Sequence, residues 1–160
     1  ANNKNAVKTK LIPKSQRYNA SIVYNYFKFK FKHLELNMNG KKIKDDFTTI
    51  AICNGTYYGG GFKIGPTSNI KDGIFEVYYA LKLPKLKIVP LILKIKNGTH
   101  ETDKNITKLE GTKLTIKSPQ PISANIDGEE IIDDKFDIEL IKDGIEIFLD
   151  KDMVDTLCKQ

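Results

Sequence analysis

The sequence has few of the side chains that build redox centres and zinc sites. Cys53 and Cys158 lie 105 positions apart, and His33 and His100 are the only two histidines among 160 residues. There is no Cys-x-x-Cys motif and no Cys/His cluster, which argues against a zinc ribbon, a disulfide scaffold or a histidine-built metal site. Reduced thiols in a cytoplasmic compartment fit this usage best. We therefore expect a cytoplasmic protein.

A long apolar segment is also missing. The longest apolar run, Ile88–Leu93, has six residues including Pro90, whereas a membrane-spanning helix needs roughly 20. The chain starts Ala1-Asn-Asn-Lys, with neither an initiator methionine nor the apolar core of a secretion signal, which is typical of a processed or excised segment. Its length predicts a single domain over residues 1–160, with residues 1–16 as a flexible or interdomain segment.

Several enzyme motifs are absent. The sequence contains no Gly-x-Gly-x-x-Gly opening a helix and no Gly-x-x-x-x-Gly-Lys-Ser/Thr loop, so neither a dinucleotide-binding βαβ unit nor a phosphate-binding loop is expected. It also lacks the Gly-x-Ser-x-Gly turn of α/β-hydrolases. The functional candidates must therefore come from other turns.

Charge is distributed unevenly along the chain. The net charge is +6, but residues 1–48 carry 11 basic and 3 acidic side chains, residues 81–117 carry 9 and 3, and residues 118–155 carry 3 and 12. A uniformly basic nucleic-acid binder would not show this asymmetry, so no nucleic-acid partner is expected. The basic segments suit phosphate or an anionic membrane surface, although a solvated lysine-rich surface is favoured over either, because lysines commonly serve solubility alone.

The first half of the chain contains a clear hairpin signal. Leu34, Leu36 and Met38 alternate with polar residues up to Asn39-Gly40, and the returning strand is predicted over Phe47–Cys53. Upstream, the Phe-Lys alternation over Phe27–Lys32 predicts another extended segment, and Ser15–Tyr26 is compatible with a helix.

The remainder reads as strands around one helix. A β-branched and aromatic run predicts a strand over Ile74–Ala80, and Pro84–Lys96 has helical spacing, with Pro90 expected to shorten or kink it. The fold class is therefore mainly β, a two-layer antiparallel β-sandwich with one or two short helices. Further strands are predicted over Ile106–Leu109, Lys113–Lys117, Ile122–Ile126, Phe136–Ile141 and Ile145–Leu149.

Two Asp-Gly turns are the chemical candidates. Asp72-Gly73 ends a loop that contains three consecutive glycines, Gly59–Gly61, and the oxygens of Asn69 and Asp72 could converge there on a hard cation. Asp127-Gly128-Glu129-Glu130 gathers three carboxylates, which could supply a general base and a metal contact. Each segment also reads as an ordinary solvated turn before a strand.

Taken in order, these motifs resemble the C-terminal domain of the diacylglycerol kinase family, in its bacterial lipid-kinase branch, which is related to the sphingosine and ceramide kinases. The resemblance runs roughly from Tyr18 to Leu149. It implies that this chain is the C-terminal substrate or lid domain of a two-domain kinase whose N-terminal nucleotide-binding domain is absent here. The matching motifs are Asn54-Gly55, Gly59-Gly60-Gly61-Phe62, Gly65-Pro66-Thr67-Ser68-Asn69, Asp72-Gly73-Ile74-Phe75-Glu76-Val77, Gly98-Thr99-His100 and Asp127-Gly128-Glu129.

The resemblance also implies roles for individual residues. Asp127 corresponds to the general base that takes the proton from the lipid hydroxyl as it attacks the γ-phosphate of ATP, and Glu129 would lie beside the phosphates. Asn69, Asp72 and the Ile74 carbonyl correspond to Mg²⁺ ligands. Implied partners are the lipid substrate at a membrane surface, which makes the protein peripheral to the membrane, and the chain's own nucleotide-binding domain. His100 receives no catalytic role.

Two alternatives stay open at this point. One is a non-enzymatic β-sandwich module that binds an anionic partner through its basic face. The other is a kinase of the same fold that acts on another lipid, such as a sphingoid base.

Overall fold

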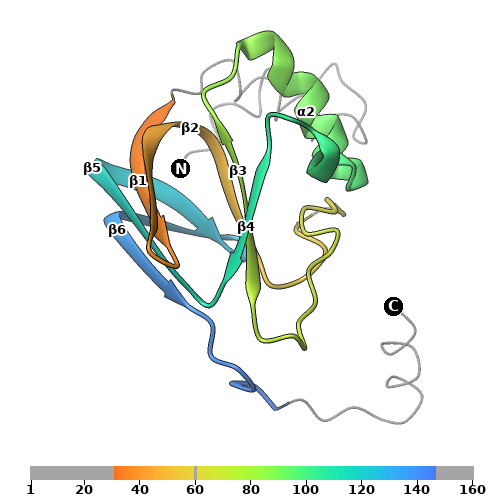
Figure 1. Cartoon of the computed structure of the whole chain (residues 1–160), viewed down its shortest axis with the longest axis vertical. Helices are drawn as coiled ribbons and strands as arrows, with labels where there is room; N and C mark the ends of the chain where they lie inside the picture. Colours follow the sequence, from red (N-terminus) through yellow and green to blue (C-terminus); the bar gives the residue numbers. More distant parts are fainter. Residues whose placement is uncertain (1–30, 60, 147–160) are drawn as a thin grey trace, which may run out of the picture.

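The computed structural model describes residues 31–59 and 61–146, so the predicted helix over 15–26 and the first four residues of the extended segment predicted over Phe27–Lys32 lie outside the described residues. Within this range the fold is mainly β, as expected (Figure 1). In chain order the elements are β1 (Lys32–Met38), β2 (Lys41–Cys53), β3 (Phe75–Leu81), α2 (Lys85–Asn97), the 3₁₀ helix η2 (His100–Thr102), β4 (Thr107–Gly111), β5 (Lys113–Ile126) and β6 (Glu129–Glu139).

All six strands join one antiparallel sheet in the order β4-β3-β2-β1-β5-β6. The predicted hairpin at Asn39-Gly40 joins β1 to β2, and the positive φ of both residues, 52° and 78°, is what a two-residue turn of this kind requires. The Asn39 side chain also donates a hydrogen bond of 2.7 Å to the carbonyl oxygen of Glu110 on β4. The first turn of the sheet is thereby tied to its far edge.

The single sheet curls until its two halves face each other. Leu109 of β4 and Ile138 of β6 pack on the same apolar core, although their strands are at opposite edges of the sheet. In a flat sheet these strands would be roughly 24 Å apart at the usual strand spacing. The expected two layers are therefore present, but they are formed by one curled sheet. The buried core comprises Leu34, Leu36, Met38, Phe47, Phe75, Val77, Tyr79, Leu114 and Ile116.

Strand β3 is buried from Phe75 to Ala80 because both of its faces are covered. Val77 and Tyr79 face the main core, while strand alternation places Glu76, Tyr78 and Ala80 on the opposite side. Ala80 belongs to a second apolar cluster, with Leu83, Ile88 and Leu91, that anchors α2. The outer face of β3 therefore lies beneath the helical segment.

Helix α2 has its predicted bounds to within one residue. It runs from Lys85 to Asn97 and continues through Pro90, so the expected shortening at this proline is wrong. Gly98 ends it in the left-handed conformation, with φ of 71°, and the Gly98 N–H bonds to the Ile95 carbonyl. No helix among the described residues is both long enough and apolar enough to span a bilayer.

The strand boundaries after α2 differ from the prediction. The segments 113–117 and 122–126 belong to one strand, β5, whose pairing with β6 shifts register between Lys117 and Ile122. Pro119 and Pro121 lie in that interval and cannot donate ladder hydrogen bonds, so the strand bends there instead of ending (Figure 1). β6 starts at Glu129, well before the predicted Phe136. Ile145 and Glu146 are not in a strand, and residues 147–149 lie outside the described range.

Candidate functional site

The glycine-containing loop between β2 and β3 folds back on itself. Tyr58 and Phe62 exchange backbone hydrogen bonds of 2.9 and 3.1 Å around the glycine tract. Further along, a side chain at Gly65 would clash, since an added Cβ would lie 2.3 Å from the Ser68 hydroxyl and 2.8 Å from the Gly55 carbonyl oxygen. Gly65 is thus needed for Ser68 to reach its buried position.

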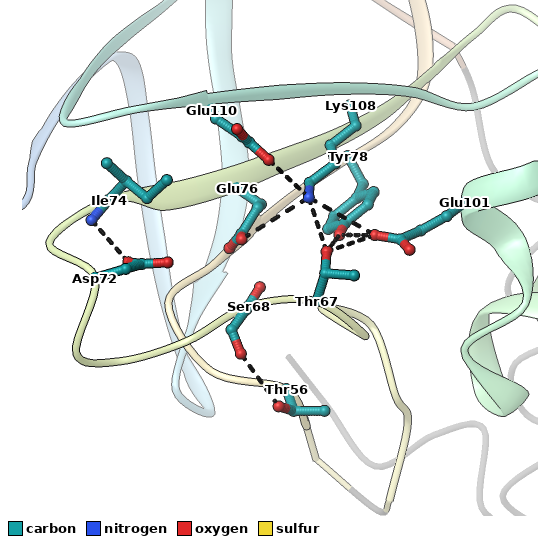
Figure 2. A network of polar contacts seen from close by, with 10 residues as sticks. All are labelled: Thr56, Thr67, Ser68, Asp72, Ile74, Glu76, Tyr78, Glu101, Lys108 and Glu110. Atoms are coloured by element: carbon teal, nitrogen blue, oxygen red, sulfur yellow. Dashed lines mark hydrogen bonds and ion pairs between the residues drawn. The ribbon is translucent and has the colours of Figure 1, made fainter. Parts of the chain in front are cut away.

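The predicted cation ligands share one tight turn. The Asn69 side-chain oxygen accepts a hydrogen bond of 3.0 Å from the Lys71 N–H, and one oxygen of Asp72 accepts one of 3.0 Å from the Ile74 N–H. The Asp72 N–H donates in turn to the Asn69 carbonyl oxygen at 3.3 Å. Figure 2 shows the second Asp72 oxygen pointing away from Ile74, toward Glu76.

Two buried oxygen groups lie beside this turn. Glu76 is 2% exposed and Ser68 is 9% exposed. The Glu76 Oε2 atom and the Ser68 Oγ atom have no hydrogen-bond partner among the described residues. In Figure 2 the Ser68 hydroxyl and the Glu76 carboxylate point toward each other. Leaving a buried polar group unpaired costs on the order of 1–3 kcal/mol, and more when it is charged.

Lys108 on β4 is the cationic partner in this region (Figure 2). Its ammonium group lies 2.8 Å from Glu110 Oε1, 3.8 Å from Glu101 Oε1 and 3.9 Å from Glu76 Oε1. It also donates a hydrogen bond of 2.7 Å to the Thr67 hydroxyl. Three carboxylates thus surround one ammonium group, so the cluster carries an excess of negative charge.

Tyr78, Thr67 and Glu101 connect η2 to the loop. The Tyr78 hydroxyl donates to Glu101 Oε1, and the Thr67 hydroxyl donates to the same oxygen at 2.7 Å. Burial raises the pKa of Glu101, but these two hydrogen bonds and the charge of Lys108 outweigh it, so the net pKa is lowered. Burial lowers the pKa of Lys108, and its hydrogen bond to Glu110 together with the surrounding carboxylates reverses this and raises it. The hydrogen bonds and ion pairs of this network thus stabilise the ionised forms of Glu101 and Lys108.

His100 and Cys53 are buried beside the site without an evident chemical role. The His100 ring packs edge-on against Tyr78, with centroids 5.0 Å apart, and its pKa is lowered by burial. Burial raises the pKa of the Cys53 thiol to about 12, so this thiol is not a poised nucleophile. Cys158 lies outside the described residues.

The second candidate turn closes the β5–β6 hairpin. Asp127 and Gly128 both have positive φ, 49° and 101°, as a two-residue hairpin turn requires. Within the described residues the carboxylates of Asp127 and Glu129 make no hydrogen bond or ion pair, and both residues are exposed. The turn is braced by Asn125, whose side-chain oxygen accepts a hydrogen bond of 3.1 Å from the Gly128 N–H.

Asn125 also connects the second turn to the glycine-containing loop. Its side-chain oxygen accepts a hydrogen bond from the Tyr58 hydroxyl, so the tip of the β5–β6 hairpin lies against the glycine-containing loop. Asn69, Asp72 and Ile74 share one turn and Asp127 and Glu129 another, and the Tyr58–Asn125 bond links the hairpin tip to the loop that carries the first turn. No direct contact between Asp127 and Asp72 is seen. The roles predicted for these five residues therefore stay predictions.

Sequence reasoning gave no role to Glu76, Ser68 or Lys108, although the first two lie in the matching motifs. A signal for Glu76 was available, since it is the one charged residue in the apolar strand Phe75–Leu81. Ser68 and Lys108 could not be found in this way because their roles depend on contacts with distant segments. Among the described residues, no three His, Cys, Asp or Glu side chains gather as in a carboxylate-rich or histidine-rich metal centre. A cation here would rely on few carboxylates and on neutral oxygens.

Fold and site together define a sandwich-like β domain. In it, the oxygen-lined loop, which is the β2–β3 loop with Ser68, Asn69 and Asp72, contacts the tip of the β5–β6 hairpin, which carries Asp127 and Glu129. Comparison with known proteins makes the class specific. The chain belongs to the family described as the YegS C-terminal NAD kinase beta sandwich-like domain, whose model matches residues 1–147. The resemblance drawn from the ordered motifs is thereby confirmed.

Individual relatives agree with this family. A protein from Yersinia enterocolitica named "Probable lipid kinase YegS-like" is 30% identical over 112 residues, which are 70% of this chain and 36% of the relative. A protein of the same name from Alcanivorax borkumensis is 24% identical over 108 residues, 65% of this chain and 35% of the relative. The chain thus spans about a third of the length of these curated relatives.

A solved structure shares the fold. A diacylglycerol kinase from Bacillus anthracis superposes with a TM-score of 0.64 at 16% sequence identity, covering 86% of this chain and 47% of that one. At this identity the likeness concerns the fold alone.

Proposed function

We propose that this chain is the C-terminal domain of a lipid kinase that transfers the γ-phosphate of ATP to a hydroxyl group of diacylglycerol or a similar lipid. The names of the relatives support the reaction class, and the domain's family supports its place in a larger enzyme. The observation on which the proposal depends is the contact between the β5–β6 hairpin tip and the glycine-containing loop, through Asn125 and Tyr58. A nucleotide-binding domain would complete the site from outside this chain.

In this proposal Asp127 is the general base. Phosphoryl transfer depends mainly on positioning and charge neutralisation, so a carboxylate near the attacking hydroxyl is sufficient and no histidine or cysteine is needed. The exposed Asp127 carboxylate, free of hydrogen bonds within the described residues, is available to accept the proton from the lipid hydroxyl. Glu129, two residues further on, would lie beside the phosphates of ATP.

The residues around Asp72 fit a Mg²⁺ ion. Mg²⁺ prefers oxygen ligands, and Asn69, Asp72 and the Ile74 carbonyl supply them. The unpaired oxygens of Glu76 and Ser68 and the excess negative charge around Lys108 are independent reasons to expect a cation nearby. Bound there, Mg²⁺ would supply positive charge that organises the loop and offsets phosphate charge. The chain's own residues orient the loop, through Thr67, Tyr78 and Glu101.

The implied setting is the cytoplasmic surface of a membrane, where ATP and the lipid substrate are both available. The basic segment over residues 81–117 would favour an anionic surface. The proposal names the lipid only by its chemical class. A sphingoid base is the alternative substrate for the same reaction.

The test is Asp127→Asn in the protein that joins this domain to its nucleotide-binding domain. Asparagine tolerates the left-handed conformation of position 127, so the turn should survive. We expect kcat for lipid phosphorylation to fall by at least about 100-fold, as for loss of a general base, with the melting temperature unchanged. Asp134→Asn is the matched control, because Asp134 is exposed on β6 of the same hairpin.

Two results would contradict the proposal. If Asp127→Asn keeps full activity, Asp127 is not the base. If the unaltered two-domain protein phosphorylates neither diacylglycerol nor a sphingoid base, the lipid-kinase function is wrong and the binding-module alternative is favoured.

A further inference from the structure

Helix α2 has two apolar faces, and within residues 31–59 and 61–146 only one of them packs against the rest of the fold. On the inner face, Ile88 and Leu91 are each 3% exposed and pack against Ala80 and Leu83. Ile92 and Ile95 complete this contact. An amphipathic surface helix would carry polar residues on the opposite side.

The outer face of α2 is apolar as well. Leu86 is 90% exposed and Leu93 is 58% exposed, and Pro90 between them is also exposed. Spacings of four and three residues place these side chains in one line along the helix. Figure 1 shows α2 outside the sheet, at the periphery of the molecule. This outer stripe, Leu86-Pro90-Leu93, therefore presents its apolar surface outward.

Lysines flank the outer stripe on both sides. At 3.6 residues per turn, Lys85 and Lys96 lie along one flank and Lys87 and Lys94 along the other. The helix contains no acidic residue. Lys94 is paired with Asp103 of the segment after η2, at 2.7 Å, yet keeps a side-chain exposure of 46%. Long lysine stems can extend beside an apolar surface while the ammonium groups reach a polar layer.

We propose that the outer stripe of α2 docks on an anionic lipid bilayer, with its leucines at the level of the acyl chains and its lysines at the headgroups. The inference rests on the proposed function, because it concerns how a lipid kinase meets its substrate. Charge complementarity favours anionic lipid as the partner of this face, since each lysine near such a surface raises the binding constant about fivefold. A protein partner is disfavoured because lysine is depleted in protein interfaces.

Docking through α2 would bring the candidate site close to the lipid. Only Gly98 and Thr99 separate α2 from η2, and Glu101 of η2 bonds to Tyr78 and to Thr67 of the loop that also carries Asp72. The same short segment thus links the membrane-facing helix to the oxygen-lined loop.

The experiment is co-sedimentation of the 160-residue chain with vesicles of phosphatidylcholine alone or mixed in equal parts with phosphatidylglycerol. The chain should sediment with the mixed vesicles and release at high salt, because screening weakens the lysine contribution. The double variant Leu86→Asp/Leu93→Asp should lose at least about tenfold in partitioning. The double variant Lys87→Glu/Lys96→Glu should lose binding to the mixed vesicles, while its sedimentation with phosphatidylcholine vesicles should equal that of the unaltered chain. The matched control is Ile132→Asp on β6, a position that is 65% exposed away from α2.

The outcomes separate docking from the proposed function. Equal sedimentation of the leucine variant and the unaltered chain, with matching circular dichroism and melting temperature, would refute docking. Docking would also be refuted if the unaltered chain did not sediment with anionic vesicles. The same holds if the chain forms a dimer through its outer stripe in sedimentation velocity and does not bind vesicles. If docking alone is wrong, the two-domain protein still phosphorylates detergent-dispersed lipid, and the leucine variant is equally active on vesicles. If the kinase function alone is wrong, vesicle binding persists without phosphorylation.

Discussion

Glu76 is the only buried carboxylate among residues 31–59 and 61–146. Glu101 and Glu110 also face Lys108, but their side chains are 27% and 52% exposed, so water can solvate their unpaired oxygens. Glu76 has only the Lys108 ammonium group at 3.9 Å, on one of its two oxygens. A buried charge is tolerated when it is paired, so its second oxygen requires a partner that the described residues do not supply.

We predict that Glu76→Gln abolishes stabilisation of the chain by Mg²⁺. A ligand at 100 times its dissociation constant stabilises the native state by about 2.7 kcal/mol, which should raise the melting temperature by roughly 5 °C or more for a chain of this size. The variant should keep its fold and lose this rise, while Glu110→Gln, which alters an exposed carboxylate of the same cluster, should keep it. Thermal unfolding with increasing Mg²⁺ measures the effect. An equal rise in the melting temperature of Glu76→Gln would show that the ion binds elsewhere. No rise for the unaltered chain would show that the chain binds no Mg²⁺ here.

At the scale of elements, the sequence predicted what local chemistry determines. The Asn39-Gly40 hairpin and the helix ended by Gly98 were found because each depends on residues a few positions apart. The union of two segments into β5 was missed because it depends on pairing with β6. The Glu76–Ser68–Lys108 cluster was missed for the same reason, since it joins residues separated by up to 40 positions.

The outer half of the β5–β6 hairpin is held against the loop by few buried contacts. Ile126, Ile131 and Ile132 are 49%, 43% and 65% exposed, so this part buries little apolar surface. Elements with few buried contacts open with low free energy. The hydrogen bond from Tyr58 to Asn125 therefore has a large share in holding the hairpin tip against the loop.

We predict that Tyr58→Phe loosens the hairpin tip without weakening the whole fold. Loss of a hydrogen bond worth about 1 kcal/mol corresponds to roughly fivefold faster amide exchange. Hydrogen–deuterium exchange should show this increase around Asn125 and Gly128, with no change in the central strand β3. Tyr57→Phe is the control, because Tyr57 is 65% exposed and its hydroxyl makes no hydrogen bond within the described residues. Unchanged exchange at the tip would mean that the Tyr58 contact does not hold it.

Over the whole molecule, acid stability depends on carboxylates that are held ionised by partners. A carboxylate with a lowered pKa in the folded state stabilises the fold above its unfolded pKa, and this contribution is lost as the pH falls through the folded value. Asp103 shows the largest of these effects, since hydrogen bonds from Lys94 and Asn105 lower its pKa to about 2. The carboxylates with lowered pKa values are Asp46, Glu101, Asp103 and Asp137.

We predict that the free energy of unfolding falls as the pH drops from about 4 to about 2, the interval between the unfolded value of 3.8 and the folded value of Asp103. Asp103→Asn removes this titration, so it should be less stable than the unaltered chain at pH 7 by about 1 kcal/mol, a figure reduced for the exposed Lys94 partner. The difference should shrink as the pH approaches 2, where the folded Asp103 is half protonated, and vanish below it, because both proteins then lack the ionised carboxylate. Urea unfolding across this range measures it, with Asp134→Asn as a control that should follow the unaltered chain. A difference that stays constant with pH would show that Asp103 acts through packing or neutral hydrogen bonds, since only an ionised group loses its contribution by protonation.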